Sequence, residues 1–219
     1  MFTSLSLTST QAVLVSYSFD EAAGNEASFA PDAIPDHLTV SDMSRGPGIN
    51  PSSSAGTFSA SGWTTDPTRD PDDYFAFSLT PEEGYLLTIT GFELDERRSG
   101  TGIREWAVYS SLDGFNTALG TFAVPDNTST RTDQALPGFG PEFQDLAGPV
   151  EFRIHGYDAE GAGGTWRIDN VEVSGSVHAR PVTSGPVHSV PEPAAWADLA
   201  VLIGLLALAG VRQRKLATG

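Results

Sequence analysis

Four aspartates lie close together in one polar segment of the chain. Carboxylate oxygens are the ligands that calcium prefers, and the ion takes about six to eight oxygens. The spacing does not follow the EF-hand loop, so the segment can be read either as a Ca²⁺ site or as an acidic loop solvated by water. The sequence suggests no cofactor other than calcium. The candidate ligands are Asp66, Asp70, Asp72 and Asp73.

Three tryptophans offer a surface for stacking on sugar rings, because an indole combines a large apolar face with a polar N–H group. Trp106 and Trp166 fit strand alternation and are expected in the core. Trp63 lies in a segment rich in Gly, Ser and Thr. It is therefore the candidate for an exposed sugar-binding residue.

No catalytic signature stands out. Neither H-E-x-x-H nor G-x-S-x-G occurs, and 28 acidic residues make any hydrolytic carboxylate pair impossible to single out. Acidic and basic residues on or beside predicted strands are expected to form charge pairs on an exposed sheet face. The sequence predicts a protein that is not an enzyme. The residues expected on that face are Glu93, Asp95, Glu96, Glu105 and Glu151, with Arg97, Arg98, Arg104 and Arg153.

The charge balance is strongly acidic. The 219 residues include 28 Asp and Glu against 12 Lys and Arg, a formal net charge of −16. This balance argues against a nucleic-acid partner, because phosphates require a basic surface. Cysteine is absent, which excludes disulfides and thiolate metal sites within the chain.

Short runs of alternating apolar residues, separated by Gly, Pro, Asn and Asp, predict the elements that would carry these side chains. We expect about eight to ten strands and no helix before Pro191. The alternation changes parity at Gly91 and again at Asn170, which predicts two β-bulges. The predicted fold is an all-β, antiparallel, jelly-roll-like β-sandwich in which the first and last strands pair.

The chain divides into four predicted parts. Residues 1–11 read as the remnant of a signal peptide or as a disordered N-terminus. Residues 12–176 form the sandwich, and residues 177–190, broken by Gly and Pro, read as a linker. Residues 191–215 form a distinct C-terminal tail.

The tail has the properties of a single membrane-spanning helix. Residues 194–211 carry one charge, Asp198, and an 18-residue helix is about 27 Å long, close to the thickness of a bilayer core. Arg212, Arg214 and Lys215 follow it and would stop translocation on the cytoplasmic side. The sandwich would then lie outside the cytoplasm.

Pro191, Glu192 and Pro193 directly precede this helix, and the arrangement of Pro-Glu-Pro, apolar helix and basic end closely resembles the PEP-CTERM sorting signal of bacterial exported proteins. The resemblance implies export by the secretion machinery, brief retention in the membrane and processing at or near Pro191–Pro193 by an exosortase-type enzyme. It further implies a final place at the cell surface or in the extracellular matrix, with extracellular polysaccharide as a partner. The β-rich segments, such as VEFRIHGYDA and GGTWRIDNVEV, resemble domains common in such proteins more loosely.

Three functions remain open at this point. The first is an exported, non-enzymatic surface or matrix protein sorted through its tail. The second is a glycan-binding module on the same scaffold, assisted by calcium, and the third, less favoured, is a polysaccharide-active enzyme. The fold alone does not separate them, because sandwiches host all three.

Overall fold

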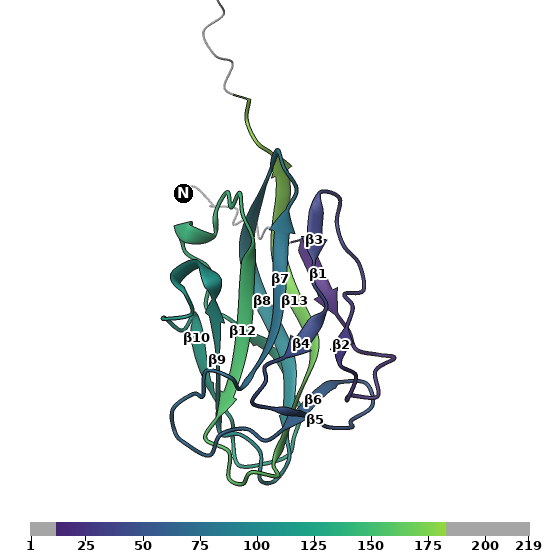
Figure 1. The fold of residues 1–219 in the computed structure, drawn as a ribbon, viewed down its shortest axis with the longest axis vertical. Coiled ribbons are helices and arrows are strands. Elements are labelled where there is room, and N and C mark those ends of the chain that lie inside the picture. Colours follow the sequence, from purple (N-terminus) through teal and green to yellow (C-terminus); the bar gives the residue numbers. More distant parts are fainter. Residues whose placement is uncertain (1–11, 183–219) are drawn as a thin grey trace, which may run out of the picture. The chain divides into compact units, whose positions relative to one another are not determined.

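The computed structural model describes residues 12–182. Two antiparallel β-sheets pack face to face, and no α-helix occurs in this part of the chain (Figure 1). The predicted antiparallel β-sandwich is confirmed, while the jelly-roll order remains a prediction. No helix within residues 12–182 is long and apolar enough to cross a membrane. Residues 1–11 and the predicted tail lie outside the described residues.

The first sheet has six strands in the order β11-β8-β13-β6-β5, and β1 also pairs with β13. The expected antiparallel pairing of the first and last strands is therefore confirmed. The two longest strands, β8 and β13, lie side by side at its centre. Its strands are β1 (Val13–Tyr17), β5 (Asn50–Pro51), β6 (Phe58–Ser61), β8 (Tyr85–Arg98), β11 (Arg131–Ala135) and β13 (Thr165–Ala179).

The second sheet has seven strands in the order β10-β9-β12-β7-β4-β2, with β3 paired to β7. Two short 3₁₀ helices occur in the connections: η1 (Ser111–Asp113) lies between β9 and β10, and η2 (Pro141–Phe143) lies between β11 and β12. Its strands are β2 (Ser28–Phe29), β3 (Leu38–Val40), β4 (Met43–Arg45), β7 (Tyr74–Pro81), β9 (Glu105–Ser110), β10 (Gly120–Ala123) and β12 (Val150–Tyr157).

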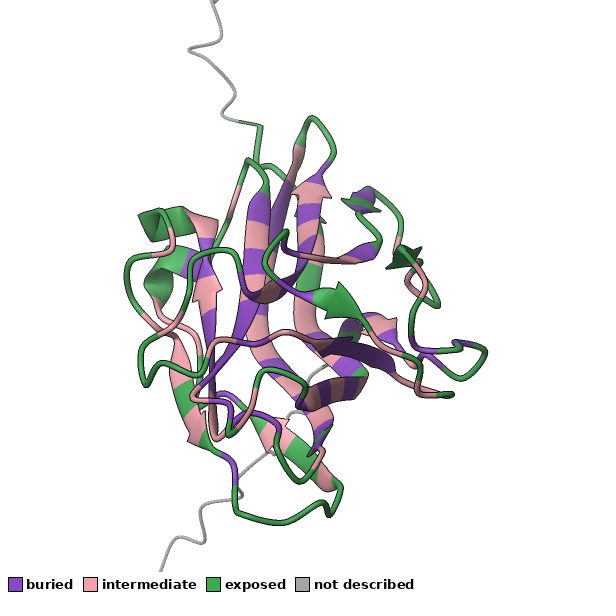
Figure 2. Ribbon diagram, turned by 60° about the horizontal axis from the view of Figure 1, so that its bottom comes forward, coloured by how far each residue is buried: buried purple, intermediate pink, exposed green. Residues whose placement is uncertain are grey.

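Aromatic side chains fill the space between the sheets. Buried and more exposed residues alternate along the strands, as the period of two requires (Figure 2). Trp106 and Trp166 are fully buried, as predicted, and their ring centroids lie 5.9 Å apart. Buried Val, Leu, Ile, Ala and Met side chains pack around these rings and complete the core.

Both predicted bulges are present. The register between β8 and β13 shifts between Ile89 and Gly91, and again between Asp169 and Glu172. Asn170 takes a positive φ of 44°, a conformation that Asn tolerates better than most residues. In β8 the first bulge moves the buried positions from Leu87 and Ile89 to the opposite parity.

The same change of parity carries charged residues inward, which corrects the expectation of an exposed charged face. Glu96 and Arg98 continue the buried alternation and are 2% and 0% exposed. The Glu96 carboxylate accepts hydrogen bonds from the Arg131 guanidinium and, at 2.8 Å, from Trp166 Nε1–H. Arg98 Nη2 lies 2.9 Å from Glu160 Oε1. These ions are buried and paired, as burial of charge requires.

The sandwich extends beyond its predicted end at residue 176. Strand β13 continues to Ala179, because its last residues pair with the beginning of β8. His178, expected in a solvated linker, therefore lies on a strand, and its Nε2 is 2.9 Å from Asp145 Oδ1.

Candidate functional site

Strand β7 presents a small residue between two larger ones on its outer face. Phe75 and Phe77 point into the core, so Tyr74, Ala76 and Ser78 point outward by alternation. Since the Ala76 side chain is only a methyl group, the sheet surface is hollowed at its position.

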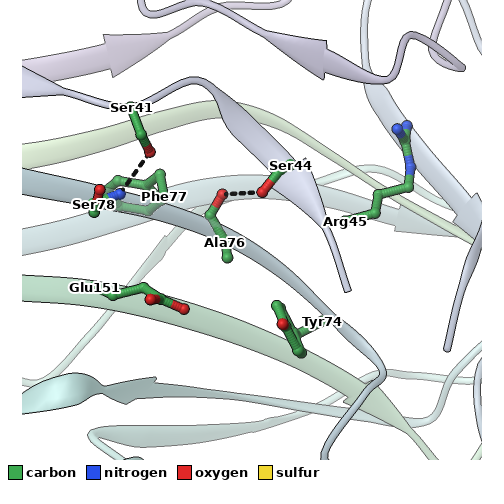
Figure 3. A pocket seen from close by; sticks show the side chains of 8 residues that line it. All are labelled: Ser41, Ser44, Arg45, Tyr74, Ala76, Phe77, Ser78 and Glu151. Atoms are coloured by element: carbon green, nitrogen blue, oxygen red, sulfur yellow. Dashed lines mark hydrogen bonds between the residues drawn. The ribbon is translucent and has the colours of Figure 1, made fainter. Parts of the chain in front are cut away.

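Strand register brings polar residues to the edges of this hollow. Ser44 of β4 is paired with Ala76, and Glu151 of β12 is paired with Ser78. With Ser41 they surround a groove of about 200 Å³ (Figure 3). Its lining therefore includes hydroxyls, one carboxylate and the Tyr74 ring, supplied by segments far apart in sequence.

Hydrogen bonds fix the groove side chains. The Ser41 hydroxyl accepts from the Ser78 N–H at 2.9 Å, and the Ser44 hydroxyl donates to the Ala76 carbonyl at 3.3 Å (Figure 3). Arg153 Nε donates to Glu151 Oε1 at 2.7 Å. The second Glu151 oxygen has no hydrogen-bond partner among the described residues, so it is available to a ligand.

Arg45 lines the groove but serves the fold. Its guanidinium donates to backbone carbonyls of Gly24, Glu26 and Ser59, and its Cζ lies 3.6 Å from the centroid of the Phe58 ring. Burial lowers the pKa of Arg45 to about 10. In Figure 3 its charged end is turned away from Tyr74 and Glu151. Arg45 thus anchors β4, and Glu151 carries the charge of the groove.

A cluster of arginines and aromatic rings borders the groove. Arg153 Cζ lies 4.3 Å from the Tyr74 ring centroid and 4.0 Å from that of Phe115, and Arg69 Cζ lies 4.0 Å from that of Tyr109. Cation–π contacts of this kind stabilise both partners. They fix the orientation of the Tyr74 ring at the groove wall.

His155 lies beneath this cluster and is 0% exposed. Its Nδ1 is 3.1 Å from the Asp70 carbonyl oxygen, and its Nε2 is 3.4 Å from Arg69 Nη1. This arrangement fits a neutral ring that donates from Nδ1 and accepts at Nε2. Burial, followed by the charge of Arg69, lowers the pKa of His155 to about 4. Both ring nitrogens are engaged, so His155 has a structural role.

The prediction that Trp63 is an exposed sugar platform is wrong. Trp63 is 1% exposed, and its ring centroid lies 5.3 Å from that of Trp166 and 5.2 Å from that of Phe75. Gly62, with φ of 86°, turns the chain after β6, and Trp63 Nε1–H donates to the Ala60 carbonyl. A left-handed residue of this kind favours glycine.

The four aspartates do not gather into a metal site. Asp73 is turned inward, 4% exposed, and its Oδ2 accepts from the Thr64 N–H at 2.7 Å. Burial, against the opposing effect of this hydrogen bond, raises the pKa of Asp73. Asp70 Oδ1 accepts from the Asp72 N–H, and Asp66 lies exposed. Within residues 12–182, no three His, Asp or Glu side chains are arranged to hold a metal ion.

The remaining predicted site residues belong to the tail. Pro191, Glu192, Pro193, Arg212, Arg214 and Lys215 all lie outside the described residues.

The groove is not evident from the sequence as a site. Glu151 is expected in charge pairs, and it does contact Arg153, but no motif marks Tyr74 or the three serines. The signal in the sequence is the run Tyr74-Phe75-Ala76-Phe77-Ser78, whose outward set alternates aromatic, small and hydroxyl side chains. This run predicts the residues that β7 contributes to the groove. It does not predict those contributed by β4 and β12.

No protein-family model and no curated protein matches this chain. Solved structures with a similar arrangement include the K1 cleaved adhesin domain of Lys-gingipain from Porphyromonas gingivalis W83, at 15% identity and a TM-score of 0.38, covering 74% of this chain and 97% of that one. Another is CBM29_1, a family 29 carbohydrate-binding module from Piromyces equi, at 13% identity and a TM-score of 0.36, covering 74% and 91%. A third is TmCBM61 in complex with β-1,4-galactotriose, at 12% identity and a TM-score of 0.30, covering 73% and 99%. These scores are too low to support a functional conclusion, so the proposals below rest on the residues of this chain.

Proposed function

We propose that the sandwich is a glycan-binding module without catalytic activity, and that the groove above Ala76 is its binding site. The observation that carries this proposal is the lining of the groove. Serine hydroxyls, the Glu151 carboxylate and the Tyr74 ring converge on a hollow of about 200 Å³ in the outer face of the seven-stranded sheet.

A sugar matches this lining better than an apolar molecule does. Sugars present several hydroxyl groups together with apolar C–H faces, so they need hydrogen-bond partners and an aromatic contact at the same time. The unpartnered Glu151 oxygen accepts a sugar hydroxyl, and the Ser44 and Ser78 hydroxyls exchange further hydrogen bonds. Because the strands hold these groups in place before a ligand arrives, binding requires little further ordering.

Filling the hollow tests this proposal. Ala76→Leu is expected to weaken glycan binding by about tenfold or more, because the larger side chain occupies the space of the ligand. Ala76 lies on the outer face but is only 6% exposed, so thermal unfolding of the variant is measured first to establish that it is folded. Binding is measured on a glycan array and then by calorimetry with the best-bound sugar.

Thr80→Leu is the matched control, since Thr80 lies on the same face of β7, two positions beyond Ser78. Its binding is expected to equal that of the original chain. Glu151→Gln, which removes the carboxylate charge, is measured as a second variant. The proposal is wrong if no sugar on the array binds, or if Ala76→Leu and Glu151→Gln both leave the affinity for the sugar unchanged.

We further propose that the module is exported and sorted to the cell surface or extracellular matrix through its tail. The sequence Pro191-Glu192-Pro193, followed by an apolar run and then Arg212, Arg214 and Lys215, carries this second proposal. Two prolines disfavour a helical conformation, so the sequence predicts an extended segment whose backbone a processing enzyme of the exosortase type could reach. Secretion machinery and the membrane would be transient partners.

Mass spectrometry of the C-terminus from fractionated cells tests the sorting proposal. The surface or matrix fraction is expected to contain chains that end near Pro191–Pro193 and lack Arg212–Gly219. Alanine at both Pro191 and Pro193 is expected to retain the unprocessed chain in the membrane fraction. An intact tail in every fraction of the original chain would show a permanent anchor and refute sorting.

A further inference from the structure

Two arginines face each other on the outer side of the six-stranded sheet. Arg97 of β8 and Arg167 of β13 occupy directly opposite positions of the antiparallel ladder. Cβ atoms at such positions are about 4.5–5.5 Å apart, and like charges there are destabilising. Burial, followed by the charge of Arg97, lowers the pKa of Arg167. Repulsion between the two arginines therefore destabilises the folded protein when no anion is bound.

Neither guanidinium has a carboxylate partner among the described residues, although the chain is strongly acidic. Arg97 Nε donates to the Thr128 carbonyl at 2.7 Å, and Arg167 Nη1 donates to the Ser54 hydroxyl at 2.8 Å. Arg167 Nε is buried and has no hydrogen-bond partner in this part of the structure. A buried donor left without a partner is destabilising, so this part of the structure lacks an acceptor.

A cavity of about 130 Å³ adjoins both arginines. Besides Arg97 and Arg167, its lining includes the hydroxyl residues Ser54, Thr57 and Thr130. These groups are hydrogen-bond donors, and guanidinium groups favour planar oxyanions that accept two bonds at once.

Two carboxylates also border the cavity, and one of them is already neutralised. Glu96 is bound by Arg131 and Trp166. Asp169 Oδ1 accepts from the Asn170 N–H at 2.8 Å. Among the residues that line the cavity, two guanidinium charges therefore oppose a single carboxylate without an arginine partner, and Asp20 and Asp95 lie near that carboxylate.

We propose that Arg97 and Arg167 form a binding site for one oxyanion, either a carboxylate or a sulfate group. An acidic sugar residue and a free small anion both carry this chemistry. Because both arginines line the cavity, the anion accepts hydrogen bonds from their guanidinium groups and relieves the repulsion between them. The site lies on the opposite sheet from the groove above Ala76, so it does not depend on the proposed function.

Thermal unfolding and calorimetry of the full chain test this site. The ligands are sodium sulfate, galacturonate and polygalacturonate, each compared with sodium chloride at the same ionic strength to separate binding from screening. An anion that binds the folded state raises Tm in proportion to its occupancy. Arg97→Gln is expected to unfold at the same or a higher Tm without anion, because it removes the like-charge pair, and to bind each anion about tenfold or more weakly.

Arg180→Gln is the matched control, since Arg180 is exposed and lies outside the cavity. It is expected to retain the full response. A stronger response to polygalacturonate than to sulfate supports the site and identifies an acidic glycan as the source of the anion, whereas equal responses support a site for small anions. The proposal fails if no anion exceeds chloride in effect, or if Arg97→Gln responds as the original chain does.

Discussion

Replacing Glu96 by alanine is expected to lower the free energy of unfolding by about 3–5 kcal/mol, because it leaves the partners of a buried ion without compensation. The Glu96 side chain is 1% exposed and that of Arg131 is 15% exposed, so water replaces the lost contact poorly. Trp166 Nε1–H, in the core, loses its acceptor as well. Urea denaturation followed by tryptophan fluorescence measures the change.

Glu93→Ala is the matched control for this prediction. Glu93 is three residues away on β8, but it points to the outer face, opposite Glu172. Its removal relieves a repulsion between like charges, so a change within about 0.5 kcal/mol or a small gain is expected. Glu96→Gln, which keeps a hydrogen-bond acceptor, is expected to fall between the two. A loss for Glu96→Ala no larger than for Glu93→Ala would contradict a buried, paired Glu96.

Acidification is expected to destabilise the fold by up to about 3 kcal/mol through His155 alone, since one pKa unit corresponds to about 1.36 kcal/mol. The pKa of His155 is about 4 in the folded protein, below its ordinary value of 6.5. Between pH 6.5 and pH 4 the His155 ring is protonated in the unfolded chain and neutral in the folded chain. The contribution is therefore complete above pH 6.5 and is lost as the pH falls towards 4.

The two charged side chains near His155, Arg69 and Arg153, lower its pKa as burial does. The hydrogen bond to the Asp70 carbonyl has the opposite effect and raises it. Asp73, Asp169 and Glu172 have raised pKa values, so their effect has the opposite sign: stability falls as the pH rises through their titration range. The difference between the original chain and a His155 variant therefore isolates the histidine.

Unfolding free energies of His155→Gln, measured in urea between pH 7 and 4, are expected to depend less on pH than those of the original chain. His178→Gln is the control, because that histidine is exposed and contacts Asp145 at the surface. Should the Gln variant fail to fold, NMR titration of the His155 ring in the original chain gives the same answer. A measured pKa near 6.5 would show that the ring is not excluded from water.

The strands and both bulges could be predicted because they depend on local alternation. The parity change at Gly91 was visible in the sequence, and extending the new parity from Phe92 and Leu94 reaches Glu96 and Arg98. Their inward direction was therefore encoded in the pattern. The pattern conflicts with the usual exposure of charged residues, and the compensating partner, Arg131, comes from a strand far along the chain.

The position of Trp63 and the groove above Ala76 could not be predicted in the same way. Trp63 follows a turn at Gly62, and its contact with Trp166 depends on how the loop folds over the core. The groove depends on the register of β7 with β4 and β12, which is set by tertiary packing. The polar composition around Trp63 predicted exposure, and long-range aromatic contacts outweighed it.

Strand β13 gives the domain a mechanical property. It is the longest strand, it runs through the centre of its sheet, and the chain leaves the sandwich directly from its end at Ala179 (Figure 1). Because ladder hydrogen bonds lie perpendicular to the strands, tension applied along β13 loads its bonds to β8 together, in shear, rather than opening them one by one. A module held by a tether at this end is therefore expected to unfold more slowly under a steady pull than one whose strands open one by one.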